Sequence, residues 1–238
     1  MEFKGVFMEN STNTTSRTPV SLSYRLLENG PGTNVLATPA PVKIEPKELT
    51  AAELRDALID LKSADSGRKQ FASATLANAK PSEAKDEVAN ALIAALEDSS
   101  WAVRQNAARA LGVWGTTSAH QPLIKTLDDS EFSVRWSAID ALAQWKDSET
   151  ASALARHIAS GADVMQAGQA LRTIGAPAED AADELLKAHD SQVRYEACRI
   201  LKDIGTKKSI PALTAAAEDA DGITAMLAKD ALRAIDAR

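Results

Sequence analysis

Three histidines and one cysteine are the side chains of this chain that could bind a metal ion or act as a nucleophile. His120, His157 and His189 fall on an expected helix start, a helix end and a loop. Metal binding needs ligands that converge on one point, so we expect ordinary surface or capping histidines and no metal site. Cys198 has no histidine beside it in the sequence, and we expect a small buried or half-buried residue there, not a nucleophile.

Carboxylates are the other groups that could do acid–base chemistry. Pairs such as Asp128-Asp129 and Glu179-Asp180 lie near expected helix ends, where acidic side chains cap helices and interact with the helix dipole. The chain contains no Gly-rich phosphate-binding loop, no Gly-x-Ser-x-Gly and no His-Glu-x-x-His motif. We therefore expect no catalytic residue and no cofactor.

The elements that position these residues repeat along the chain. An alanine stands four residues before each of five leucines, and Trp or Ile stands three residues after it. The leucines recur at intervals of 29 to 31 residues, at Leu111, Leu142, Leu171, Leu201 and Leu232. Offsets of −4, 0 and +3 share one face of an α-helix, and a period near 30 residues indicates a helical solenoid. Trp114 and Trp145 both take the +3 position, where we expect large packing residues.

Each repeat is predicted to contain two helices, named here helix A and helix B. The A helices are expected at about 83–97, 119–128, 148–159, 178–188 and 210–218, and the B helices at about 101–114, 132–145, 163–174, 192–204 and 222–236. A less regular pair at about 50–62 and 67–79 precedes them and is expected to cap the array. Its start carries Thr50 and Glu53 in the spacing of a capping box.

Composition sets limits on the partner and the domain organisation. Residues 1–48 are rich in Ser, Thr, Asn and Pro, which predicts a disordered N-terminal arm before an ordered domain at 49–238. The net charge of −6 argues against nucleic acid as the main partner. No apolar run is long enough to cross a bilayer, and the first residues lack the apolar core of a secretory signal. We expect a cytoplasmic protein with no membrane partner.

One motif, Asp-x-x-x-x-Val-Arg-x-x-Ala-x-x-x-Leu, resembles HEAT repeats of the short, roughly 30-residue bacterial kind. It is clearest at Asp98/Val103/Arg104, Asp129/Val134/Arg135 and Asp190/Val193/Arg194. The resemblance implies an all-α fold, a right-handed α–α superhelix of about six helix pairs behind the arm, in which Asp and Arg pair between neighbouring repeats. Two copies have Asp163-Val164 and Thr224-Ala225 in place of Val-Arg, and we expect the ladder of pairs to be broken there.

The outer face of the B helices is the candidate binding surface, because B helices line the concave side of HEAT-type solenoids. The side chains six residues before each leucine point away from the core, at Gln105, Trp136, Met165, Tyr195 and Met226. A polar row lies two residues before each leucine, at Arg109, Asp140, Gln169, Arg199 and Asp230. Trp, Tyr and Met are frequent in interfaces, so we expect a continuous ridge in a concave groove. The opposing interpretation is that tight curvature or the N-terminal arm covers these side chains.

These observations favour a non-catalytic scaffold or adaptor that binds a protein or peptide partner in the groove. The apolar stretch 35–42 of the arm is a candidate internal ligand, since its tether raises its effective concentration. One alternative is a HEAT-like bilin lyase acting on phycobiliproteins, with Trp136 and Tyr195 lining a pocket. Another is a glycosylase of the DNA-alkylation-repeat type. That role needs a basic concave face, whereas the two rows hold two Arg and two Asp.

Overall fold

The computed structural model describes residues 46–238, which form twelve α-helices in six antiparallel A/B pairs. The A helices are α1 (Ala51–Leu61), α3 (Lys85–Ala95), α5 (His120–Thr126), α7 (Ser148–Ala159), α9 (Glu179–Leu185) and α11 (Ile210–Ala216). The B helices are α2 (Ser66–Ala77), α4 (Trp101–Trp114), α6 (Phe132–Leu142), α8 (Val164–Ile174), α10 (Ser191–Ile204) and α12 (Gly222–Asp236). The predicted disorder of the arm concerns residues that lie almost entirely outside this described part.

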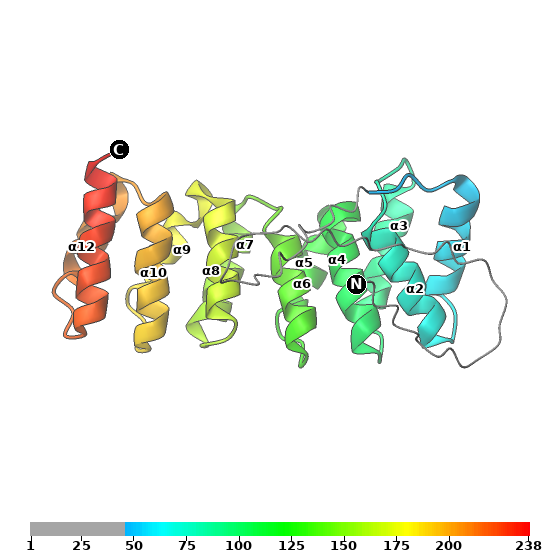
Figure 1. Cartoon of the computed structure of the whole chain (residues 1–238), viewed down its shortest axis with the longest axis horizontal. Helices are drawn as coiled ribbons and strands as arrows, with labels where there is room; N and C mark the ends of the chain where they lie inside the picture. Colours follow the sequence, from blue (N-terminus) through cyan, green and yellow to red (C-terminus); the bar gives the residue numbers. More distant parts are fainter. Residues whose placement is uncertain (1–45) are drawn as a thin grey trace, which may run out of the picture. The chain divides into compact units, whose positions relative to one another are not determined.

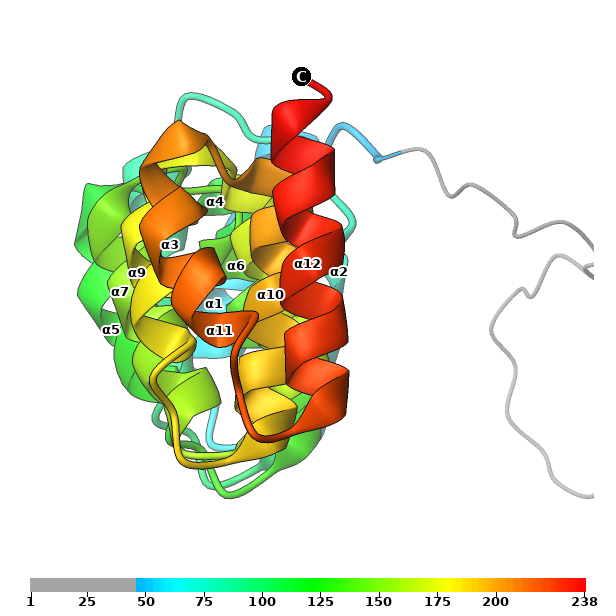
Figure 2. The same ribbon diagram turned by 90° about the vertical axis from the view of Figure 1, so that its left-hand side faces the viewer.

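The helices of the described part are arranged in two layers. The B helices stand side by side in chain order, from α2 to α12 (Figure 1), and each packs on the next one along the chain. The A helices form the second layer behind them (Figure 2). One-turn 3-10 helices at Thr117–Ala119, Ala176–Ala178 and Lys207–Ser209 lead into α5, α9 and α11. The predicted all-α solenoid of six helix pairs is confirmed.

The repeated leucines and alanines form the core between the layers. The alanines four residues before each leucine are all fully buried, and so are Leu111, Leu142, Leu171 and Leu201. Leu232 is only half-buried, because no further repeat covers the last pair. The same contact between buried alanine and leucine side chains therefore recurs from one repeat to the next, as the period predicts.

The two tryptophans at the +3 position do not share one environment. Trp114 is fully buried, and its indole N–H donates to the Leu76 carbonyl oxygen in the preceding pair at 2.8 Å. Trp145 is half-buried, because α6 ends at Leu142 and leaves Trp145 in the following loop. There it covers Gly115, where an added Cβ would lie 2.7 Å from the indole ring. Both tryptophans are packing residues as expected, but Trp114 is fully buried whereas Trp145 packs against the edge of the core.

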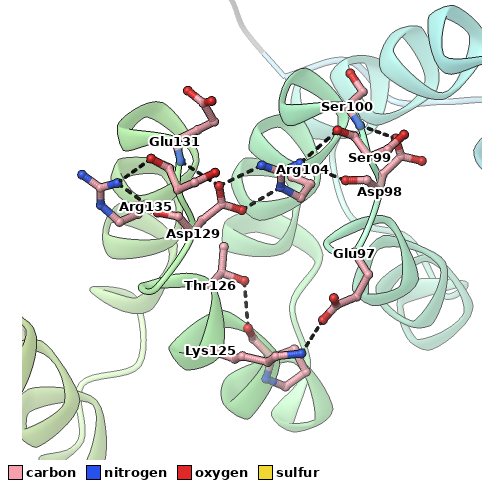
Figure 3. A network of polar contacts seen from close by, with 12 residues as sticks. Glu97, Asp98, Ser99, Ser100, Arg104, Lys125, Thr126, Asp129, Glu131 and Arg135 are labelled. Carbon is pink, nitrogen blue, oxygen red and sulfur yellow. Dashed lines mark hydrogen bonds and ion pairs between the residues drawn. The ribbon is translucent and has the colours of Figure 1, made fainter.

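A ladder of ion pairs ties the starts of neighbouring B helices together. Arg104 Nε and Nη2 bind the two carboxylate oxygens of Asp129 at 2.6 and 2.9 Å, while its Nη1 donates to the Asp98 carbonyl oxygen at 2.9 Å (Figure 3). Each such arginine therefore holds its own A–B loop and the next one. The other rungs are Lys69–Asp98 at 2.6 Å, Arg135–Asp163 at 2.6 Å and Arg194–Asp219 at 2.9 Å.

The ladder is interrupted at one of the places where the sequence predicts a break. Val164 stands where α4, α6 and α10 have the ladder arginine, and its side chain cannot donate a hydrogen bond. Among the described residues no ion pair joins the start of α8 to Asp190. Asp163 still receives the preceding rung, because it accepts from Arg135 although it lies later in its repeat than Asp129 does. Between α8 and α10 the connection is Arg172 to the buried Glu196, at 2.5 Å.

Candidate interaction surface

Exposed apolar side chains are concentrated on the B-helix layer. Nine large apolar residues of the described part are exposed, and Ile59 on α1 is the single one that lies on an A helix. The other eight are Phe71, Trp101, Val113, Phe132, Trp136, Met165, Ile223 and Met226. An apolar side chain on a surface is ordinary, but eight on one layer of a two-layer array mark a candidate interface.

The structure places the predicted ridge residues on this face. Trp136, Met165 and Met226 are 44%, 73% and 58% exposed, whereas Gln105 and Tyr195 are half-buried. In the polar row Asp230 is half-buried and the remaining four side chains are exposed, at Arg109, Asp140, Gln169 and Arg199. None of these side chains is buried between the layers, but their role in binding stays a prediction.

Besides Phe71 on α2, two aromatic residues of this surface lie outside the ridge that the sequence analysis identified. Trp101 and Phe132 are 50% and 57% exposed, and each stands ten residues before the leucine of its repeat. That offset is one helical turn before the ridge position, so extending the i, i+4 stripe by one step would have found them. Together with Trp136, Met165, Tyr195, Ile223 and Met226, they are called the apolar strip below.

The centre of the strip borders a surface hollow of about 650 Å³. Trp136 of α6, Met165 of α8, Tyr195 and Arg199 of α10, and Leu227 of α12 line it. The hollow therefore brings together three of the five predicted ridge residues and one residue of the polar row. The rest of the predicted set does not line it: Gln105, Arg109, Asp140, Gln169, Met226 and Asp230.

Trp136 is held in place by the next repeat. Its indole N–H donates to Asp163 Oδ1 at 2.7 Å, and the Phe132 ring meets it edge-on with centroids 5.4 Å apart. Asp163 is the N-cap of α8 and has φ 45°, in the left-handed region that Asp tolerates better than most residues. Burial would raise the pKa of Asp163, but hydrogen bonds from Arg135, His157 and Trp136 outweigh it and leave the pKa below its usual value.

Tyr195 is held in the same way two repeats later. Its hydroxyl donates to Oδ2 of Asp221 at 2.7 Å, and Asp221 is the N-cap of α12 as Asp163 is of α8. In both cases an aromatic donor at the ridge position meets the capping carboxylate of the following B helix. Two aromatic rings of the strip are thus fixed before any partner arrives.

Two histidines expected at the surface are buried, and this corrects the sequence analysis. His120 Nε2 is 2.7 Å from Thr150 Oγ1, and its ring lies 5.8 Å from that of Trp145. His157 Nε2 is 3.0 Å from Asp163 Oδ2. Both are covered because their partners come from the following loop or repeat, which the sequence did not place. His189 is exposed as expected.

Nothing in the described part points to metal or thiol chemistry. Residues 46–238 contain no group of three or more His, Cys, Asp or Glu side chains arranged to hold a metal ion. Cys198 is buried as predicted, and that burial raises the pKa of its thiol to about 11, which keeps it protonated near neutral pH. None of the helices described here is long and apolar enough to cross a membrane.

The comparisons with known proteins agree with this architecture. The family description of HEAT repeats matches residues 89–172 and 165–233, together more than half of the chain. The chain therefore belongs to the HEAT-repeat family. No curated protein gives a significant match.

The chain is also similar to several solved structures. The complex of CpcE and CpcF of phycocyanin lyase from Nostoc sp. PCC7120 is similar at 25% identity with a TM-score of 0.50, over 86% of this chain and 81% of that one. An engineered protein is similar at 23% identity with a TM-score of 0.50, over 78% of this chain and 97% of its own. A designed armadillo repeat protein is similar at 22% identity with a TM-score of 0.47, over 76% and 99%.

Proposed function

We propose that this protein is a non-catalytic interaction scaffold that binds a polypeptide segment of a partner protein along the apolar strip. The observation that carries the proposal is the one-sided distribution of exposed large apolar side chains within residues 46–238, where eight of nine lie on the B helices. Aromatic residues and methionine are enriched in protein interfaces relative to the remaining surface. The rigid stack supplies the surface, and the strip supplies the affinity.

The fixed aromatic rings support binding more than the flexible methionines do. Trp136 and Tyr195 each have a hydrogen-bond partner in the next repeat, so their side chains lose little conformational freedom when a partner binds. Such rigid aromatic anchors are the residues that most often dominate binding energy. Met165, 73% exposed at the edge of the same hollow, can adapt to different partner side chains.

The length of the strip indicates the size of the bound segment. Neighbouring helices pack about 10 Å apart, so the strip from α4 to α12 runs on the order of 40 Å. An extended segment of roughly twelve residues or a helix of roughly twenty-seven residues would cover that distance.

The proposal is tested by partner recovery from cells, followed by direct binding to the recovered partner. The Trp136→Ala/Tyr195→Ala double variant should lose a partner that the wild type retains. Ile59→Ala is the matched control, since Ile59 is 56% exposed but lies on α1 in the other layer. Equal recovery by the wild type and the double variant would contradict the proposal.

A second candidate function is action on phycobiliproteins, which the similarity to the phycocyanin lyase complex favours. The hollow beside Trp136 and Tyr195 would then receive a bilin chromophore. Incubation with a bilin and an apo-phycobiliprotein should then change the visible absorbance, and the double variant should reduce that change. An unchanged spectrum with wild-type protein would leave the scaffold as the better explanation.

A further inference from the structure

Acidic residues border the apolar strip on one side. The N-caps of the B helices from α2 to α12 are Asp65, Ser100, Glu131, Asp163, Asp190 and Asp221, so five of the six are acidic. Glu131 directly precedes Phe132, the first residue of α6, and Asp221 stands two residues before Ile223. The starts of α6, α8, α10 and α12 thus each place a carboxylate within a turn or so of the strip.

Most basic side chains on this side are already neutralised. Lys69, Arg104, Arg135 and Arg194 are each used by a ladder aspartate, so the ladder contributes no net charge. Among the residues described here, Glu131, Asp190 and Asp221 have no ion-pair partner. The helix dipole supplies only about half a positive charge at each N-terminus, which leaves a net negative charge at these three caps.

The opposite side of the strip has no such surplus. In the polar row Arg109 and Arg199 balance Asp140 and Asp230, and Gln169 is neutral. The charge on the B-helix face is therefore asymmetric: a negative edge along the helix starts, the apolar strip beside it, and a neutral row beyond.

We infer that the segment bound by this surface is basic as well as apolar, with Lys or Arg side chains facing the edge formed by Glu131, Asp190 and Asp221. This inference rests on the proposed function and adds the chemistry of the partner to it. Opposite charges across an interface steer the encounter and fix the register of the bound segment. A second copy of the chain is a poor occupant, since it carries the same net charge of −6.

The test is selection of peptides from an unbiased library on the immobilised full chain. Random displayed peptides of roughly 16 residues are long enough to cover the strip when extended. The peptide most enriched by selection is then synthesised with a fluorescent label, and its Kd is measured by anisotropy at low and high salt. The wild type is compared with an edge variant, Glu131→Gln/Asp190→Asn/Asp221→Asn.

The edge variant removes charge while keeping the caps. Asp190 and Asp221 accept backbone N–H groups of their helices, which asparagine can also do, and Glu131 makes no side-chain capping bond. The control, Asp56→Asn/Glu83→Gln/Asp86→Asn, removes three exposed carboxylates on or beside the A helices α1 and α3. Both variants change the net charge equally, so long-range effects cancel in the comparison. Thermal unfolding of both checks that they are folded.

The expected result is enrichment of peptides that combine apolar residues with Lys or Arg. Their Kd should rise at least about fivefold in the edge variant, and with added salt, but stay unchanged in the control. Apolar peptides without a basic surplus that still lose binding on Trp136→Ala would overturn the inference and leave the proposed function intact. Selected peptides whose Kd is changed neither by Trp136→Ala nor by the edge variant would overturn the proposed function as well.

Discussion

The indole nitrogen of Trp136 and the carboxylate of Asp163 are 2.7 Å apart, and this bond joins an exposed aromatic ring to the N-cap of the next B helix. The same carboxylate accepts from Arg135 and His157. One side chain thus links the stability of the stack to the geometry of the surface that we propose for binding.

Removing this carboxylate should destabilise the fold. Asp163→Ala leaves Arg135, Trp136 and His157 without their shared acceptor, and we expect a loss of about 2 kcal/mol or more in the free energy of unfolding. Asp163→Asn should lose less, because asparagine accepts hydrogen bonds and also tolerates the left-handed backbone. Urea unfolding of both variants measures the difference. Equal losses would show that charge alone, not the shared acceptor, matters at this position.

Acid should weaken the ladder. Burial opposes a lower pKa at Asp98, but bonds from Lys69 and Ser100 outweigh it, and the Arg104 guanidinium lowers the pKa of Asp129; both therefore lie below the usual 3.8. Such groups stabilise the folded state above their unfolded pKa and lose that contribution as pH falls through the folded pKa.

The free energy of unfolding should therefore stay nearly level from neutral pH to roughly 5 and fall steeply below about pH 4. Urea titrations across this range measure it. Asp129→Asn should be less stable at neutral pH and show a smaller acid-induced drop than the wild type. Parallel curves for the two proteins would disprove the contribution of this rung.

The Trp136 ring should matter for binding more than for folding. Trp136→Ala should weaken binding of a partner segment by about 1–2 kcal/mol, as expected for an exposed aromatic anchor. Its effect on unfolding should stay below about 1 kcal/mol, because the side chain is 44% exposed. Trp136→Phe keeps the apolar ring but loses the bond to Asp163, so it separates contact area from positioning. Unfolding of the protein by Trp136→Ala would place this residue in the core instead.

The repeated leucines should differ in importance along the array. Leu142→Ala removes a fully buried side chain in a central pair and should cost about 2–5 kcal/mol. Leu232→Ala should cost less, since Leu232 is only half-buried in the last pair. The comparison uses chemical denaturation of the two variants under the same conditions. Equal costs would argue against a linear array with an open end.

Periodicity predicted the helices closely because local sequence determines most of their ends. The B helix expected at 101–114 is Trp101–Trp114, and the A helix expected at 148–159 is Ser148–Ala159. The capping box at Thr50 and Glu53 is present, with Glu53 N–H donating to Thr50 Oγ1 at 3.2 Å. The short A helices end earlier than expected, because their last apolar residues belong to the closing turn.

The features that the sequence analysis missed depend on contacts between repeats. His120 and His157 are buried by Thr150, Trp145 and Asp163, none of which belongs to the same helix. The ladder acceptor Asp163 sits later in its repeat than Asp129 does, so alignment to a fixed motif position did not identify it as the acceptor of Arg135. A one-dimensional period describes what each repeat shares, but not the side chains that adapt to a particular neighbour.

The ladder also decides how this array can be rebuilt by protein engineering. The second and third pairs, ending in α4 and α6, each carry an aspartate that receives the previous repeat and an arginine that reaches the next. These two pairs are interchangeable, because each has both an acceptor for the preceding repeat and a donor for the following one. A duplicated copy of either pair would therefore lengthen the array without leaving an unmatched charge. The fourth pair has the acceptor, Asp163, but it has Val164 at the position where the second and third pairs carry the donor arginine. Any shuffling of modules must therefore keep the fourth and fifth pairs together, joined by Arg172 and Glu196.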